Sequence, residues 1–173
     1  MAEKQENKMK EVLLEKVTVN MGVGQAGEEL EKAAKIMEYI TNAKPIRTVA
    51  RIKQPTWGLR EGLPIGVKVT LRGKAANEFL EKALLAKDKK LSKSVFDTRG
   101  NFGFGVKEHI DIPKVKYDPK MGIKGFDVLV TLKRRGYRIK RRKLAKCKIS
   151  PKHMLTKNDA IQFMRNVYGV EVA

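Results

Sequence analysis

Alternation of apolar and polar side chains recurs along the chain and constrains its fold more than any other feature. In Ile65–Leu71, isoleucine, valine and leucine alternate with glycine, lysine and threonine, and residues 17–21, Ile46–Ile52 and Phe126–Lys133 repeat the pattern. Successive side chains of a β-strand point to opposite faces, so each segment is predicted to be a strand with one buried face. The strand that begins at Phe126 is expected to continue through Ile139.

Three helices are expected between and after these strands. Glu28–Thr41 carries one apolar stripe and three glutamates at its start, where the helix dipole favours acids. Ala75–Ala86 is also helical in pattern. A last helix begins at Thr156, where Asp159 completes a sequence resembling a capping box, and it stops at Gly169. Strands and single helices in this order predict an α+β fold with the helices packed on one sheet face.

The other face of the predicted sheet would be cationic. If the apolar positions meet the helices, the outward positions are Lys16, Thr18, Asn20, Arg47, Arg51, Lys68, Thr70, Arg72, Thr131 and Lys133. Asp127 is the one acid among the outward positions of these strands. Cations and short hydrogen-bonding side chains suit phosphates and 2′-hydroxyls. The face therefore favours RNA, and the alternative is an ordinary solvated sheet surface.

Charge points in the same direction. The 173 residues carry a net charge of +19, and Lys133–Lys152 holds eleven basic residues and no acid. Such a run repels itself unless phosphates neutralise it, so a polyanion is the expected partner. Within it, Arg134, Arg135, Arg138, Lys140 and Arg141 are the candidate RNA ligands. A solvated tail, a nuclear-localisation signal and a membrane-surface patch are the alternatives.

Composition excludes several other classes. The longest apolar stretches fall far short of the roughly 20 residues of a membrane span, and the charged start of the chain is no secretory signal. One cysteine, Cys147, and two separated histidines, His109 and His153, give no disulfide framework and no metal-ligand cluster. We therefore expect one domain, residues 1–173, with a basic region at about 133–152, no metal, no cofactor and no enzymatic activity.

A glycine motif offers a competing interpretation. Residues 22–27, Gly-Val-Gly-Gln-Ala-Gly, match the G-x-G-x-x-G fingerprint of dinucleotide-binding enzymes. The preceding strand alternates instead of being wholly apolar, and no acid ends a second strand about 20 residues later. Gly22 and Gly24 are therefore expected to let the turn approach an RNA phosphate, with a nucleotide-dependent enzyme as the alternative.

Aromatic residues could add stacking contacts. Phe102 and Phe104 lie in a segment similar to an RNA-recognition motif, and they suit the core and base stacking equally. Trp57 lies in a loop rich in proline and glycine between Lys53 and Arg60. An indole beside cations is a candidate for stacking on a nucleotide, and the alternative is packing on the protein's own surface.

Four ordered motifs resemble one family over nearly the whole chain. They are Val-Thr-Val-Asn-Met-Gly-Val-Gly at 17–24, Pro-Ile-Gly-Val-Lys-Val-Thr-Leu-Arg-Gly at 64–73, Thr-Arg-Gly-Asn-Phe-Gly-Phe-Gly-Val-Lys-Glu-His-Ile-Asp at 98–111 and Lys-Tyr-Asp-Pro at 116–119. Together they resemble the ribosomal protein L5 family of the large subunit. The basic segment 134–143 and the tail after it are similar to the archaeal and eukaryotic branch, and Ile112–Val115 favours an archaeal source.

The resemblance implies a specific fold and set of partners. The family has a mostly antiparallel sheet backed by helices, lies in the central protuberance of the cytoplasmic ribosome and binds 5S rRNA through its open face. Other expected partners are the large-subunit rRNA, the P-site tRNA and a small-subunit protein. By motif position, Asn20, Trp57 and Thr70 should contact 5S rRNA, and Lys53, Gln54 and Arg60 lie in the loop expected near the tRNA. A free RNA-binding regulator outside the ribosome is the remaining alternative.

Overall fold

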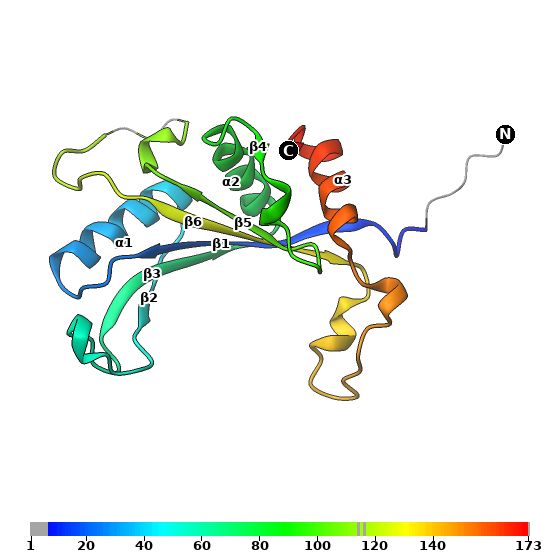
Figure 1. Ribbon diagram of the computed structural model, residues 1–173, viewed down its shortest axis with the longest axis horizontal. Helices are drawn as coiled ribbons and strands as arrows, with labels where there is room; N and C mark the ends of the chain where they lie inside the picture. The colour runs from blue at the N-terminus through cyan, green and yellow to red at the C-terminus, as the bar shows by residue number, and fades with distance from the viewer. Residues whose placement is uncertain (1–6, 114, 116, 173) are drawn as a thin grey trace.

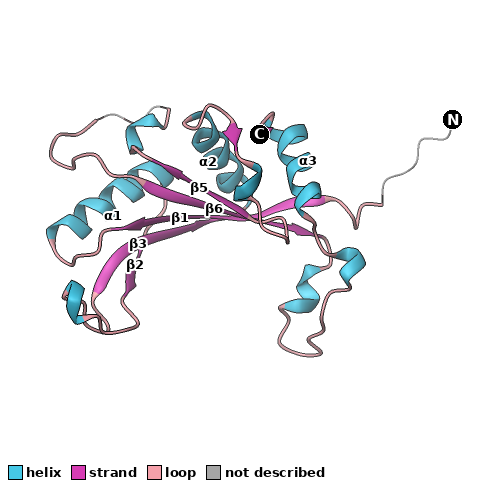
Figure 2. Cartoon of the chain, viewed as in Figure 1, coloured by secondary structure: helices cyan, strands magenta, loops and turns pink. Residues whose placement is uncertain are grey.

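The computed structural model describes residues 7–113, 115 and 117–172 and contains one five-stranded antiparallel sheet. Its strands, in the spatial order β2-β3-β1-β6-β5, are β1 (Val12–Gly22), β2 (Ile46–Val49), β3 (Pro64–Leu71), β5 (Phe102–Val106) and β6 (Phe126–Arg134). Figure 2 shows them as one curved layer. The alternating segments thus form the sheet that the sequence predicts. The first six residues, and Lys116 of the fourth motif, lie outside the described residues.

All three helices lie on one side of the sheet (Figure 1). They are α1 (Glu28–Thr41), α2 (Gly73–Leu85) and α3 (Lys157–Tyr168), and a short parallel pair, β4 (Lys90–Leu91) with β7 (Glu171–Val172), lies beside them. The α+β class, and helices on one face only, are confirmed.

The core fills the space between the helices and the sheet. On β1, Val17, Val19 and Met21 are at most 1% exposed, while the intervening side chains are only half-buried. From α1, Leu30 and Met37 reach the same core. Burying an apolar side chain of this size stabilises a fold by roughly 1.5–3 kcal/mol, so this packing fixes which sheet face is left open.

The last helix begins and ends where the sequence indicates. The Thr156 side chain accepts a hydrogen bond from the Asp159 backbone N–H, and the Asp159 carboxylate accepts one from the Thr156 N–H at 3.0 Å. Gly169 closes the helix with a φ of 62°, a conformation that glycine adopts without strain.

The second half of the sheet departs from the sequence prediction in two places. The strand expected to run on to Ile139 ends at Arg134, because Gly136 turns the chain with a φ of 86° and a 3-10 helix, Tyr137–Lys140, follows. The aromatic segment forms strand β5, in which Phe102 and Phe104 are 4% and 8% exposed. These two phenylalanines are core residues, which resolves the alternative in favour of packing over stacking.

Two segments project from the sheet on the side away from the helices (Figure 1). One is the loop 50–63 between β2 and β3, which we call the tip loop. The other is residues 135–153, between β6 and α3, which we call the basic arm. The open sheet surface lies between them in the same view.

Candidate nucleic-acid interface

The sheet surface opposite the helices, here called the open face, has polar side chains at its centre. Its two middle rows, read across neighbouring strands, are Lys68–Asn20–Asp127 and Thr70–Thr18–Leu129. Directly opposed side chains on antiparallel strands lie about 5 Å apart at their Cβ atoms, so the two rows form one contiguous patch. The predicted outward positions of β1, β3 and β6 are therefore confirmed.

The central side chains of this patch are unpaired within the part of the chain that the structure describes. Asn20, Lys68 and Thr70 make no side-chain hydrogen bond or ion pair with any residue that the structure describes. Lys68 and Thr70 are exposed, and Asn20 is half-buried between its neighbours. An ammonium group, an amide and a hydroxyl together can bind phosphate oxygens, 2′-hydroxyls and base edges.

Arg47 does not lie on the open face, and that part of the prediction was wrong. On β2 it pairs with Val67, which is buried against the helices, while Ile46 pairs with the outward Lys68. The Arg47 guanidinium instead donates to the Glu31 carboxylate of α1 at 2.5 Å. β2 is an edge strand beside the acidic first turn of α1, so an arginine is satisfied on its helix side and its isoleucine is left 68% exposed.

Two other predicted arginines lie just outside the strands. Arg51 follows the end of β2 and is exposed in the bend that begins the tip loop. Arg72 is the N-cap residue of α2, and its Nη1 lies 3.8 Å from Oε1 of Glu15. Neither is part of the central patch: Arg51 lies in the tip loop, and Arg72 follows the last residue of β3.

The glycine motif extends the edge of β1 instead of cradling a nucleotide. Gly22 pairs with Gly66 of β3, and the Gly24 N–H donates to the Ile65 carbonyl at 2.9 Å with a φ of 78°. β1 pairs antiparallel with both of its neighbours, whereas the dinucleotide fingerprint belongs to a parallel strand–helix–strand unit. The antiparallel topology therefore removes the context that the enzyme alternative requires.

The tip loop presents its polar and aromatic residues to solvent. Gln54 and Leu59 form a small bridge through two backbone hydrogen bonds of 3.0 Å, with a 3-10 turn at Pro55–Trp57 between them. Trp57 is 74% exposed, so it does not pack on the protein's own surface. Lys53, Gln54 and Arg60 are exposed beside it. The loop thus offers an indole and two cations at the end of an ordered hairpin.

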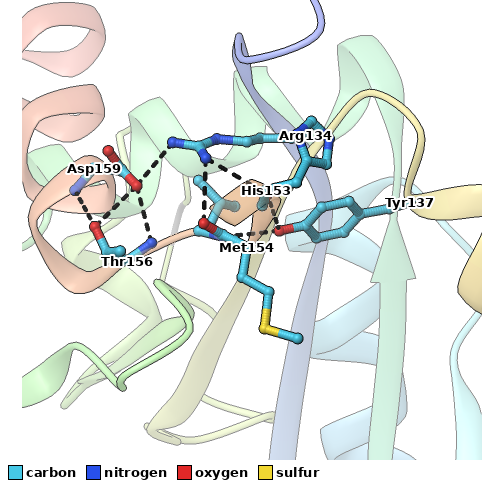
Figure 3. A network of polar contacts seen from close by, with 7 residues as sticks. Arg134, Tyr137, His153, Met154, Thr156 and Asp159 are labelled. Carbon is cyan, nitrogen blue, oxygen red and sulfur yellow. Dashed lines mark hydrogen bonds and ion pairs between the residues drawn. The ribbon is translucent and has the colours of Figure 1, made fainter. Parts of the chain in front are cut away.

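The two ends of the basic arm are fastened together by a polar network (Figure 3). Arg134 donates to the Asp159 carboxylate at 2.9 Å and to the Met154 carbonyl at 3.2 Å. The Tyr137 hydroxyl accepts from the Leu155 N–H at 2.9 Å, and a His153 ring nitrogen lies 2.8 Å from the Arg135 carbonyl. Arg134 is only 11% exposed at its side chain, so it holds the arm in place and does not face solvent as predicted.

A buried acid, Glu15, was missed by the sequence analysis. Its side chain is 1% exposed and pairs with the Arg141 guanidinium through both carboxylate oxygens. The one signal in the sequence is that alternation counted back from Val17 puts an acid, Glu15, at a core position. In the structure Leu14 packs on the core side with Val17 instead, although the two are three positions apart. Simple alternation cannot put both on one face, so a bulge was needed between them.

The remaining cations of the arm divide into paired and unpaired ones. Arg135 lies 3.2 Å from the Glu11 carboxylate, and both side chains are half-exposed. Arg138 and Lys140 are exposed, and no carboxylate among the described residues lies within ion-pair distance of them. Of the five predicted RNA ligands in the basic run, Arg134 of β6 and four arm residues, Arg138 and Lys140 are thus the two without an ion pair among the described residues.

Acidic side chains concentrate on the helix side of the molecule. Glu28, Glu29 and Glu31 occupy the first turn of α1. Hydrogen bonds from Lys124 first, and from Lys32 second, hold the pKa of the Glu29 carboxyl below its ordinary value. These pairs neutralise Lys32 and Lys124 on the helix side, although Lys35 of α1 and Lys82 of α2 have no ion pair among the described residues.

No other part of the described chain offers a competing site. His109 is 3% exposed in the core, where its Nδ1 accepts from the Lys124 N–H at 3.4 Å, and Cys147 is free and exposed. The described residues contain no group of three or more potential metal ligands. None of the described helices is long and apolar enough to cross a bilayer.

Comparison with known families covers nearly the whole chain. Residues 7–60 match a family described as "Ribosomal protein L5", and residues 64–163 match the C-terminal part of the same ribosomal family. The first match ends within the tip loop and the second begins with β3, so together they include the strands of the open face and the basic arm.

Individual relatives match over most of their length. A protein of Methanococcus aeolicus is 49% identical over 162 residues, covering 92% of this chain and 90% of that protein. One from Methanoregula boonei is 49% identical over a match that covers 99% of that protein, and one from Sulfolobus acidocaldarius is 48% identical over a match that covers 95% of that protein. All three are called "Large ribosomal subunit protein uL5".

Proposed function

The chain belongs to the ribosomal protein L5 family, with archaeal relatives, and from that premise we propose that it binds 5S rRNA through its open face. As a member of that family it is a structural protein of the large ribosomal subunit and not an enzyme. The proposal further places it in the central protuberance of the subunit, as a single RNA-binding domain.

The observation that carries the proposal is the patch around Asn20. Lys68, Asn20 and Thr70 lie side by side, lack partners among the described residues, and point away from the helices. The tip loop and the basic arm flank the same surface and carry exposed cations. RNA would be recognised there by shape, phosphate and 2′-hydroxyl contacts, with few base-specific bonds.

The two flanking segments suit the other proposed partners. The tip loop would contact the P-site tRNA through Lys53, Gln54 and Arg60. The exposed Trp57 beside them would stack on a base of 5S rRNA, a contact worth about 1–3 kcal/mol. Arg138 and Lys140 of the basic arm, which flanks the open face, would contact the 5S rRNA bound there as well as large-subunit rRNA. A contact with a small-subunit protein completes the proposed set of partners.

The test is a binding titration of 5S rRNA with single substitutions. Asn20→Ala and Thr70→Ala should each weaken binding by about fivefold to thirtyfold, the range expected for one or two lost hydrogen bonds. Asn166→Ala is the matched control, because Asn166 is exposed on α3, on the helix side. Equal losses for Asn166→Ala and Asn20→Ala would contradict recognition by the open face.

A further inference from the structure

A buried carboxylate, Glu15, adds to the one exposed acid, Asp127, on a sheet face that we propose binds RNA. Leu14 pairs with Leu132, but Lys16 pairs with Thr131, so Glu15 is the extra residue of a β-bulge in β1. The bulge turns Glu15 toward the open face, beside Arg72, yet its side chain is only 1% exposed. An acid at this place repels phosphate, so its presence requires an explanation.

The contacts of Glu15 come from two cations distant in sequence. Arg141, 126 positions later in the basic arm, donates Nη1 to Oε1 and Nη2 to Oε2, the latter at 2.5 Å. Arg72, at the end of β3, lies 3.8 Å away. Two parallel bonds from one guanidinium to one carboxylate fix both the distance and the orientation of the pair.

The pair ties the middle of the basic arm to the sheet. The ends of the arm are already held by Arg134 on Asp159 and by Tyr137 on the Leu155 backbone. Within the arm, the Cys147 N–H donates to the Ile139 carbonyl at 3.3 Å. With its ends and its middle fixed, the arm presents Arg138 and Lys140 in one arrangement before any ligand arrives.

We propose that Glu15 is a positioning residue for RNA binding, whose carboxylate holds the basic arm through Arg141 so that an acidic side chain raises RNA affinity. The inference rests on the proposed RNA-binding function. An arm that is already ordered loses less conformational entropy when it binds RNA, so it binds more tightly. The arm is thereby part of the interface from the start and not a tail that folds on RNA.

The sign of the effect separates this proposal from simple electrostatics. Glu15→Gln removes a negative charge from a protein of net charge +19, which by charge alone should tighten RNA binding or leave it unchanged. The proposal requires the opposite. Binding of 5S rRNA should weaken roughly tenfold, the effect of having to order one or two long side chains on binding.

Glu11→Gln is the matched control. Glu11 also pairs with an arginine of the arm, Arg135 at 3.2 Å, but both side chains are about half-exposed. The Glu11 substitution removes the same charge without unfastening the arm, so its binding should equal or exceed that of the unaltered protein. Glu15→Gln should also cause no further loss in an Arg141→Gln background, because the effect acts through that guanidinium.

Hydrogen exchange of the free protein tests whether the arm is ordered before RNA binds, and its first measurement uses the unaltered protein. Backbone amides of Arg141, Arg142 and Cys147 are hydrogen-bonded within the arm and should exchange slowly without RNA. Glu15→Gln should accelerate these amides while those of β1 and β3 stay protected.

Three results would overturn the proposal: unaltered or tighter RNA binding by Glu15→Gln, an equal loss in the Arg141→Gln background, or fast exchange throughout the arm of the unaltered protein. Failure of the unaltered protein to bind 5S rRNA would instead refute the proposed function. The exchange measurement would still decide whether Glu15 orders the arm.

Discussion

Replacing Arg134 by glutamine should destabilise the fold far more than replacing Arg138, although both arginines belong to the same basic run. The Arg134 side chain is 11% exposed and donates to Asp159 at 2.9 Å, to the Met154 carbonyl at 3.2 Å and to the His153 carbonyl at 3.5 Å. Arg138 is exposed and has no ion-pair partner among the described residues. The substitution therefore separates a structural charge from one available to RNA.

The magnitude follows from these contacts. A hydrogen bond between charged groups contributes about 1.5–3 kcal/mol, and the low end applies because Asp159 is 29% exposed. The two bonds to backbone carbonyls, one of them long, add about 1 kcal/mol together. Since Asp159 keeps its bonds to Thr156, the helix cap survives. We expect Arg134→Gln to lower the free energy of unfolding by about 2–3 kcal/mol, and Arg138→Gln by less than about 0.5 kcal/mol.

Urea unfolding and a salt titration of RNA binding measure the two effects. For a chain of this size the expected loss lowers the melting temperature by about 4–12 °C and leaves the denaturant slope unchanged. Arg138→Gln should instead reduce the slope of log affinity against log salt by about 0.7–0.9, the effect of one lost phosphate contact. An unchanged stability for Arg134→Gln, together with a reduced salt slope, would refute the structural role assigned to this arginine.

Two further predictions concern pH and the tip loop. Burial first, and the charge of Glu81 second, raise the pKa of Tyr168. As the pH rises, the unfolded chain therefore loses this proton before the folded protein does, and the stability that Tyr168 contributes below about pH 10 should be lost above it. Urea unfolding at about pH 9 and about pH 11 should show a smaller loss of stability for Tyr168→Phe than for the unaltered protein, and equal losses would argue against the effect. Deleting Lys53–Gly62 leaves Arg51 and Ile52 as a two-residue connection between Ala50 and Leu63, whose backbones are already joined by a hydrogen bond of 2.8 Å. The shortened protein should therefore fold and keep most of its 5S rRNA binding, which loses only the Trp57 contact, while ribosomes containing it retain P-site tRNA poorly. Lost 5S binding with normal tRNA retention would reverse the assignment.

The sequence predicted the sheet and the three helices because their patterns are local. Alternation in Ile65–Leu71 and the cap at Thr156 each specify a conformation within a few residues, and the structure confirms both. Alternation could not predict which side chains of β2 point to the open face. This edge strand has only four residues, and its orientation depends on α1, whose Glu31 pairs with Arg47. Strand β5 was not predicted because its outward positions are glycines, which do not give the alternation of apolar and polar side chains that marks a strand.

The candidate site divides in the same way. Asn20 and Thr70 could be placed on the open face from alternation alone, and the register between β1 and β3 confirms their positions. The partners of the arm's arginines could not be predicted, because Glu15 and Arg141 are separated by 126 positions and meet only through a bulge and a turn. Counting the charges of the run therefore overstated how many are free for RNA.

The most direct test of RNA binding by the open face is lysine acetylation of the free protein and of its complex with 5S rRNA, read by mass spectrometry. Lys68 is exposed at the centre of the open face, whereas Lys74, whose side chain is 92% exposed, lies on α2 on the opposite side. If RNA binds the open face, Lys68 should be strongly protected in the complex and labelling of Lys74 should be unchanged. Protection of Lys74 with full labelling of Lys68 would contradict binding by the open face.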